Sequence, residues 1–421
     1  MRGKIQKFLS SELGRGSLIL FITINIMNFF NFLFHFAMGR MLGPENYGIL
    51  AVLMSLIYVY SIPTEAIQNL ITNSTSKLNK ENKLGKIKYI MFRSLNKGFK
   101  IGVILFIVLC TISYFVNIFL KINIWLLFIT NLTIISSFVT PITRGVLQGR
   151  KKFNKLGLNL IIESLFKLVI SILLVYLGFK VFGVMVGVLI GIGIAFFTSY
   201  LFNKKVLSSN IEKENLGILK IQSVPYFISM FVIYSLLSMD IILAKIFFSP
   251  DIVGQYSVLS MMGKILFFGT FAISKALFPL TCENKENYKK SINLFKKAFF
   301  LIFFLIVIAV LFYWVFPEYI IKIFYGNQYI QIAPLMIFTG ISFGVLSWIN
   351  LIFIYSLSAG KMKKPFYLIL FLFLEIILLT FFHQTIKIYT LALMFSNIII
   401  FIMSLFLVKY AKTGNNYSCT Q

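Results

Sequence analysis

The chain has 421 residues, of which 59% are hydrophobic, and 48 of them are Phe. A soluble protein of this composition could not cover its surface with polar groups, so the composition excludes a soluble globular domain. The formal net charge of +27 would suit a nucleic-acid partner. The charges, however, alternate with apolar runs along the chain, and this distribution argues against nucleic-acid binding.

The apolar residues gather in twelve runs, and each is close to the roughly 20 residues that an α-helix needs to cross hydrocarbon. A closed β-barrel is the only other spanning structure, and runs without strict alternation favour helices. We therefore predict an all-α integral membrane protein with twelve transmembrane helices. The runs lie approximately at residues 17–38, 49–71, 98–116, 122–141, 157–178, 181–203, 222–245, 253–280, 297–316, 331–357, 365–382 and 388–408.

Lys and Arg concentrate at the N-terminus and in every second connection between the runs. The other connections hold one basic residue each, namely Arg40, Lys121, Lys180, Lys245, Lys322 and Lys387. The positive-inside rule then predicts a multi-pass protein of the cell (cytoplasmic) membrane with both termini cytoplasmic, its basic surface close to anionic lipid headgroups. The first run is too long for a signal peptide and lacks a small-residue cleavage site, so we interpret it as a span.

Two hairpins share one pattern, in which a Pro and an acidic residue are followed by two further residues and then by Gly. They are GRMLGPENYGIL, residues 39–50, and AKIFFSPDIVGQYSVL, residues 244–259. A second correspondence links RGVLQGRKKF with YSLSAGKMKKPF. Any helical hairpin favours Pro and Gly in a short turn, but two in register favour duplication. We predict two parallel six-helix repeats, residues 1–205 and 206–421.

GRMLGPENYGIL resembles the first hairpin of the Wzx-type polysaccharide flippases, in the multidrug/oligosaccharidyl-lipid/polysaccharide exporter superfamily. RGVLQGRKKF is similar to the end of their fourth span, and FPEYIIKIFYGNQYIQIAPLMIF to their interfacial helix and tenth span. The resemblance implies a two-lobed transporter with a central cavity. It would flip a polyprenyl-diphosphate-linked oligosaccharide from the cytoplasmic to the outer leaflet by alternating access, for polysaccharide biosynthesis. The absence of an extra pair of spans weighs against the fourteen-helix lipid II flippases.

The first run carries a polar stripe of Asn25, Asn28, Asn31 and His35 on one part of the helix circumference. We expect the Asn amides to line the cavity and bind sugar hydroxyls, with interhelical contact as the alternative. His35 and Asp240 fall near the outer ends of their runs at matching positions. They are candidates for an outer gate, although two residues merely near water would look the same.

Glu65 follows Pro63 in the second run and shares a helix face with Tyr58 and Asn69. A lone carboxyl in a low-dielectric site can carry a proton, so Glu65 is a candidate for ion coupling. The alternative is a carboxylate solvated at the cytoplasmic end of its span.

Glu163 and Lys167 in the fifth run are spaced for an intrahelical ion pair. We favour that structural pair. In the functional alternative, an entering phosphate competes for Lys167 and leaves Glu163 to take a proton.

Lys264 lies near the middle of the eighth run, and Lys275 follows about three helical turns later on nearly the same face. A diphosphate headgroup would bind to such a series of cations. Alternatively, Lys275 snorkels to the interface and Lys264 pairs with a buried acid. Glu375 in the eleventh run is a weaker candidate for ion coupling, or else the partner of Lys264.

The sequence contains no phosphate-binding loop, metal-ligand cluster or nucleophile elbow, so we expect no enzyme, cofactor or metal site. The energy would come from an ion gradient, as in an antiporter, from the membrane potential, or from substrate removal.

Expected partners are the lipid-linked oligosaccharide, membrane lipids and polysaccharide polymerase or glycosyltransferase machinery, without nucleic acid. The alternative function is a cation-coupled drug efflux pump, which predicts an acidic, aromatic-lined cavity. A membrane enzyme would need larger outer loops.

Overall fold

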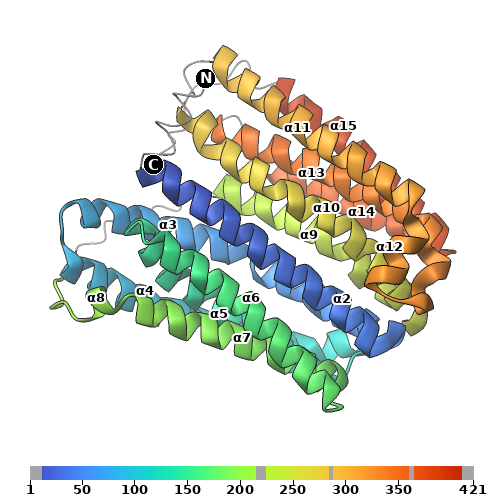
Figure 1. Cartoon of the computed structure of the whole chain (residues 1–421), viewed down its shortest axis with the longest axis horizontal. Coiled ribbons are helices and arrows are strands. Elements are labelled where there is room, and N and C mark those ends of the chain that lie inside the picture. The colour runs from blue at the N-terminus through green and yellow to red at the C-terminus, as the bar shows by residue number, and fades with distance from the viewer. Residues whose placement is uncertain (1–11, 215–223, 284–287, 360–364, 410–421) are drawn as a thin grey trace. The chain divides into compact units, whose positions relative to one another are not determined.

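The computed structural model describes residues 12–214, 224–283, 288–359 and 365–409, and throughout these ranges the regular structure is helical (Figure 1). The helices are α2 (Glu12–Tyr60), α3 (Ile62–Lys80), α4 (Leu84–Leu120), α5 (Ile124–Gly149), α6 (Phe153–Tyr176), α7 (Lys180–Phe202), α8 (Lys204–Leu207), α9 (Val224–Phe247), α10 (Pro250–Glu283), α11 (Tyr288–Val315), α12 (Pro317–Phe324), α13 (Met336–Ser358), α14 (Ile369–Phe381) and α15 (Ile386–Lys409), with the short 3₁₀ segments η1 (Asn327–Leu335) and η2 (Pro365–Leu368).

Within the described residues, 10 helical stretches are long and apolar enough to cross a membrane. The first of them, Leu18–Lys80, has 63 residues and contains two of the predicted runs. The shorter apolar helix Pro365–Phe381 coincides with the eleventh predicted run. The all-α membrane class is therefore confirmed, whereas the count of twelve spans and the pair of repeats stay predictions.

The long helix α2 is interrupted at Gly43, whose φ of 72° and ψ of 171° are not helical. A positive φ is readily available only to Gly, so this residue lets the chain turn between two runs. Pro44 then starts the next helical segment with Glu45 directly behind it, and Pro250 and Asp251 start α10 in the same way. Pro is preorganised for the first helical position, and an acidic residue in the first turn interacts favourably with the helix dipole.

The hairpin glycines have a different role from the one predicted. Gly48 and Gly254 lie inside helices and not in turns. A Cβ atom on Gly48 would lie 2.8 Å from the backbone nitrogen of Gly254. A Cβ on Gly254 would collide with the carbonyl group of Pro44. Both glycines are thus needed because the two hairpins pack backbone against backbone.

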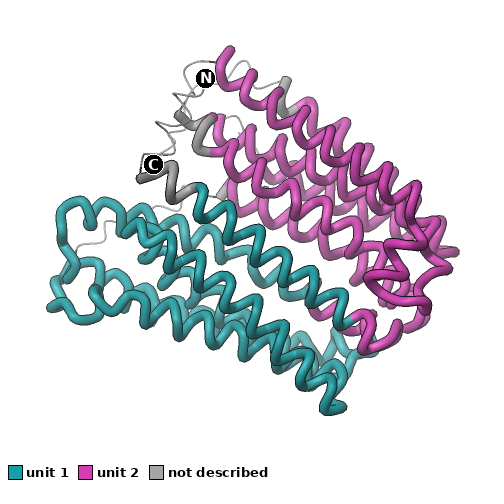
Figure 2. Tube along the Cα trace, in the orientation of Figure 1, with its two compact units in different colours: residues 1–38, 56–221 teal, residues 39–55, 222–421 magenta. Residues whose placement is uncertain are grey.

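The chain divides into two compact units, which are coloured separately in Figure 2. Unit 1 contains residues 1–38 and 56–221, and unit 2 contains residues 39–55 and 222–421. The first hairpin therefore packs with unit 2, although the residues on both sides of it belong to unit 1. The predicted repeat boundary at residues 205 and 206 stays a prediction, since a packing unit need not coincide with a repeat.

Arg40 holds the first hairpin on α12 within unit 2. Its guanidinium donates hydrogen bonds to three carbonyl groups at the end of that helix, those of Lys322, Ile323 and Phe324, with 3.1 Å between Nε and the Phe324 oxygen. The last carbonyls of a helix have no intrahelical partner, so a cation at this position is favourable. Arg40, the one basic residue in the connection between the first two apolar runs, therefore has a structural role. Tyr329 supports the same contact by donating from its hydroxyl to the carbonyl of Gly39 at 3.1 Å.

Candidate functional site

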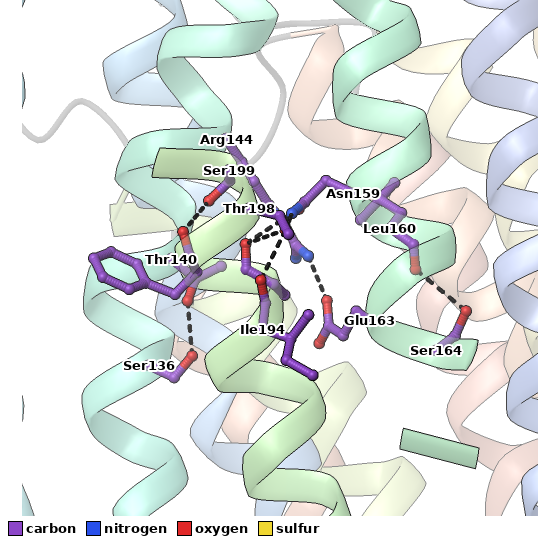
Figure 3. Close-up of polar contacts among 12 residues, drawn as sticks. Ser136, Thr140, Arg144, Asn159, Leu160, Glu163, Ser164, Ile194, Thr198 and Ser199 are labelled. Carbon is purple, nitrogen blue, oxygen red and sulfur yellow. Dashed lines mark hydrogen bonds and ion pairs between the residues drawn. The ribbon is translucent and has the colours of Figure 1, made fainter. Parts of the chain in front are cut away.

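A buried polar cluster in unit 1 is organised by Arg144 of α5 (Figure 3). Nε of Arg144 donates to Oδ1 of Asn159 at 2.7 Å, and its Nη2 donates to the carboxylate of Glu163. The Asn159 amide in turn donates to the Ala195 carbonyl and to the Thr198 hydroxyl, both at 2.7 Å. The cluster therefore links α5, α6 and α7 through hydrogen bonds between side chains and to one backbone carbonyl.

Arg144 is absent from the predicted site, because its position suggested one of the cations in the connection after the fourth run. The structure extends α5 to Gly149, so Arg144 lies within the helix and its side chain is 10% exposed. A signal for this site exists in the next helix. Asn159, Glu163 and Lys167 follow one another at intervals of four residues and so form one polar stripe on α6.

Lys167 and Asn31, both predicted to bind substrate, are brought together in unit 1. The Lys167 ammonium donates to Oδ1 of Asn31 and lies 4.5 Å from the centre of the Phe34 ring. The favoured interpretation of Glu163 and Lys167 as partners of one another is corrected, because Glu163 pairs with Arg144 and Lys167 with Asn31.

The partners of these charges leave the cluster with an excess of positive charge. One carboxylate, Glu163, faces the guanidinium of Arg144. Lys167 is held by an amide oxygen and a ring face, neither of which carries a full negative charge. Lys167 and Glu163 are also only partly buried. The cluster has the properties of a site for an anion.

The other predicted residues of unit 1 have varied surroundings. Asn25 is exposed and its amide donates to the Phe21 carbonyl of its own helix at 2.7 Å, while Asn28 is partly buried. His35 is 5% exposed and packs at an angle of 85° to the Phe34 ring. Glu65 is partly buried in the first turn of α3. The face predicted for Tyr58, Glu65 and Asn69 is interrupted, since α2 ends at Tyr60 and α3 begins at Ile62.

A second polar cluster, in unit 2, surrounds Asp240 of α9. Nζ of Lys264 lies 3.3 Å from Oδ1 of Asp240, and the two side chains are 2% and 0% exposed. Ser260 donates to Oδ2 at 2.5 Å and Tyr256 at 3.2 Å, while the Tyr389 hydroxyl donates to the backbone carbonyl of Asp240 at 2.7 Å. Every polar atom of the Asp240 carboxylate therefore has a donor.

This geometry corrects two interpretations. The acid that pairs with Lys264 is Asp240 and not Glu375. Asp240 is also not a residue near water, because it is 0% exposed. A gate role for His35 and Asp240 stays a prediction. Lys275 differs from Lys264 in being exposed, with its ammonium 4.7 Å from the centre of the Phe271 ring.

Glu375 of α14 is 0% exposed, and among the described residues neither of its carboxyl oxygens has a hydrogen-bond partner. A carboxylate buried in this way needs a proton or a cation to offset the cost of its charge. Glu375 is therefore the predicted coupling residue whose surroundings fit that role best. Within the described part of the chain, no group of three or more His, Cys, Asp or Glu residues could hold a metal ion.

Comparison with solved structures shows the fold of MATE transporters. A MATE transporter in complex with MaD5 has a TM-score of 0.68 at 16% identity, with 98% of each chain covered. An inward-facing multidrug resistance MATE family transporter of the MOP superfamily has a TM-score of 0.71 at 13% identity, with 95% of this chain and 100% of that chain covered. A MOP superfamily transporter from Pyrococcus furiosus, described as having a binding pocket of reverse polarity that suggests a different function, has a TM-score of 0.63 at 16% identity, with 97% and 99% covered.

The chain thus shares its fold with these solved transporters. A family model described as "Polysaccharide biosynthesis protein" matches residues 37–334, which is more than half of the chain. The chain belongs to this family, and the family predicted from the hairpin motifs is confirmed. No curated protein matches the sequence.

Proposed function

We propose that this transporter is a flippase that moves a polyprenyl-diphosphate-linked oligosaccharide from the cytoplasmic to the outer leaflet by alternating access. The family membership supports a role in polysaccharide biosynthesis. The observation that carries the proposal is the excess of positive charge around Lys167 and Arg144, with Glu163 as the one carboxylate of that cluster. A cation inside a membrane is costly and calls for an anionic partner, which the diphosphate of the cargo would supply.

In this proposal Lys167 exchanges the Asn31 oxygen for a phosphate oxygen when the cargo enters. Asn31 is then released to bind a sugar hydroxyl, as proposed for Asn25 and Asn28 along the same helix. Arg144 keeps Glu163 in place through a charge-assisted hydrogen bond, so the acid does not compete with the phosphate for Lys167. The prenyl tail stays in the lipid, and polymerase or glycosyltransferase machinery supplies and consumes the cargo.

The energy for net transport would come from protonation or cation binding at buried acids. Glu375 is the leading candidate because it is fully buried without hydrogen bonds. Glu65 and Glu163 are proposed to contribute in unit 1, and Lys264 and Lys275 to bind the headgroup in unit 2. Because Lys264 is paired with Asp240, its ammonium can bind the headgroup only after this ion pair has broken.

Lys167→Gln is expected to lower flipping by about tenfold or more, because it removes a charged hydrogen-bond donor worth roughly 1.5–3 kcal/mol. Lys167→Arg should keep most of the activity. The assay uses a host without its own polysaccharide flippase and measures the leaflet in which labelled lipid-linked oligosaccharide is found. Lys180→Gln, an exposed residue at the start of α7, is the matched control. Full activity of Lys167→Gln would contradict the proposed phosphate contact.

A second candidate function is cation-coupled efflux of small organic molecules. The fold shared with MATE multidrug transporters favours it, as do Asp240 and Glu375, which are buried acids in the described part of unit 2. A drug-sensitive host that expresses the protein separates the candidates. Resistance to cationic drugs without oligosaccharide flipping would select efflux, and the reverse result would select the flippase.

We expect the protein to lie in the cell membrane with both ends of the chain on the cytoplasmic side. The basic connections predict this orientation because positively charged loops are retained on the cytoplasmic side. A reporter that is active only in the cytoplasm should give a signal when fused after residue 421. It should give none when inserted after Gly178 in the connection between α6 and α7. The opposite pattern of reporter signals would contradict the predicted orientation.

A further inference from the structure

The helix α4 is much longer than a membrane is thick. Its 37 residues span about 55 Å, against about 30 Å of hydrocarbon. Large exposed apolar side chains follow one another from Phe99, which is 54% exposed, to Phe119, which is 68% exposed. That stretch alone is about 30 Å long. The part of α4 before Phe99 therefore projects through the lipid headgroups.

A groove of about 520 Å³ lies on this projecting part of α4. It is lined by Tyr89, Phe92, Arg93 and Asn96 of the helix and by Ile211. The Arg93 guanidinium lies 5.9 Å from the centre of the Tyr89 ring and donates to its hydroxyl at 3.2 Å. Arg93 and Asn96 lie one to two turns outside Phe99, which is the depth at which lipid phosphates lie.

The far wall of the groove is fixed to α4 by basic side chains. We call residues 207–214 the strap. Nζ of Lys88 donates to the strap carbonyls of Leu207 at 2.6 Å and Ser209 at 2.8 Å, and Lys86 pairs with Glu214 at 2.5 Å. These contacts on both sides of Ile211 hold its exposed side chain against the groove. The groove is open to its surroundings, and its wall at Ile211 is held in place by these contacts.

The charge beside the groove is positive. Arg93, Lys97 and Lys100 are all exposed and lie on one face of α4 at intervals of four and three residues. Phe92 and Phe99 are exposed on the adjacent face. Of the nearby acids, Glu81 pairs with Lys83 and Glu214 with Lys86, while Glu212 is exposed on the strap. A basic stripe beside an aromatic stripe matches a ligand with an anionic head and an apolar tail.

We propose that this groove binds the phosphate of an anionic membrane lipid. Arg93 in the groove and Lys97 and Lys100 beside it contact the phosphate, and Asn96 adds an amide donor. The apolar chain runs from there into the hydrocarbon along Phe99 and the exposed apolar side chains that follow it. The phosphate comes either from a bulk anionic phospholipid or from a polyprenyl diphosphate. Lys167 is not among the residues that line the groove, and lipid binding there does not depend on the proposed transport function.

The test uses the purified full-length protein, stripped of lipid, and native mass spectrometry with phosphatidylglycerol, phosphatidylcholine and a polyprenyl diphosphate as probes. The variant Arg93→Gln/Lys97→Gln/Lys100→Gln is expected to bind the anionic probes with an affinity reduced by about tenfold or more. Ile211→Glu, which adds a negative charge to the groove without changing α4, should act in the same direction. The control Lys289→Gln/Lys296→Gln/Lys297→Gln removes three exposed cations at the start of α11.

Loss of binding in the two groove variants and not in the control supports the site, and the tighter anionic probe identifies the source of the phosphate. Equal losses in the groove and control triple variants would show attraction by surface charge in general and overturn the proposal. Equal binding of phosphatidylcholine to the unchanged protein would overturn it as well. Because the readout is binding and not transport, neither result depends on whether the protein is a flippase.

Discussion

Gly254→Ala should destabilise the protein by about 3 kcal/mol, as expected for a collision that no flexible side chain can relieve. A Cβ at this position meets the carbonyl oxygen, carbonyl carbon and Cα of Pro44, which are all backbone atoms. Relief would require the two hairpins to separate. Thermal unfolding of the purified protein in detergent, followed by tryptophan fluorescence, measures the effect.

Gly269→Ala is the matched control for this prediction, because Gly269 belongs to the same helix, α10, and a Cβ there has no atom within 4 Å. Ala is the better helix former by up to about 1 kcal/mol, so this variant should be as stable as the unchanged protein or slightly more so. If both variants unfold at the same temperature, the hairpins do not pack as the structure describes.

Lys264→Met is expected to cost about 3–5 kcal/mol, the usual result of removing one partner from a buried ion pair. Asp240, which is 0% exposed, would be left with the hydroxyl donors Ser260 and Tyr256 but without a countercharge. The measurement is again thermal unfolding in detergent, together with the yield of folded protein.

The double variant Asp240→Asn/Lys264→Met removes both charges at nearly constant volume, and we expect it to regain most of the lost stability. We expect flipping to stay low in this variant, because Lys264 is proposed to bind the headgroup. Stability without transport would support that role. If transport returns in full together with stability, the pair is structural only.

The sequence was sufficient for the membrane class and the family. In lipid, long apolar runs can form few structures other than membrane-spanning helices. The residues of the hairpin motifs are specific enough to indicate the family. It was insufficient for the partners of buried charges. Asn31 and Lys167, or Asp240 and Lys264, lie on different helices. Which helix faces meet depends on side-chain packing, and a hydropathy pattern does not specify it.

Spacing within one helix was a misleading guide for Glu163. The interval of four residues to Lys167 permits an intrahelical pair, but such pairs contribute only about 0.2–0.5 kcal/mol. Arg144 offers a planar guanidinium that also bonds Asn159, so the contact between helices prevails. Arg144 was not predicted as a site residue because it lies close to the basic residues after α5. The sequence does not show whether a residue at that position belongs to the end of the helix or to the connection that follows.

The membership of residues 39–55 in unit 2 has a consequence for any attempt to divide this protein. The chain passes from unit 1 to unit 2, returns, and passes over again, so no single cut in the backbone yields two self-sufficient pieces. A gene split between the codons for residues 214 and 224 would encode an N-terminal fragment whose first hairpin packs on the other fragment. Each fragment alone would expose an apolar surface, and functional complementation would require that both be made in the same cell.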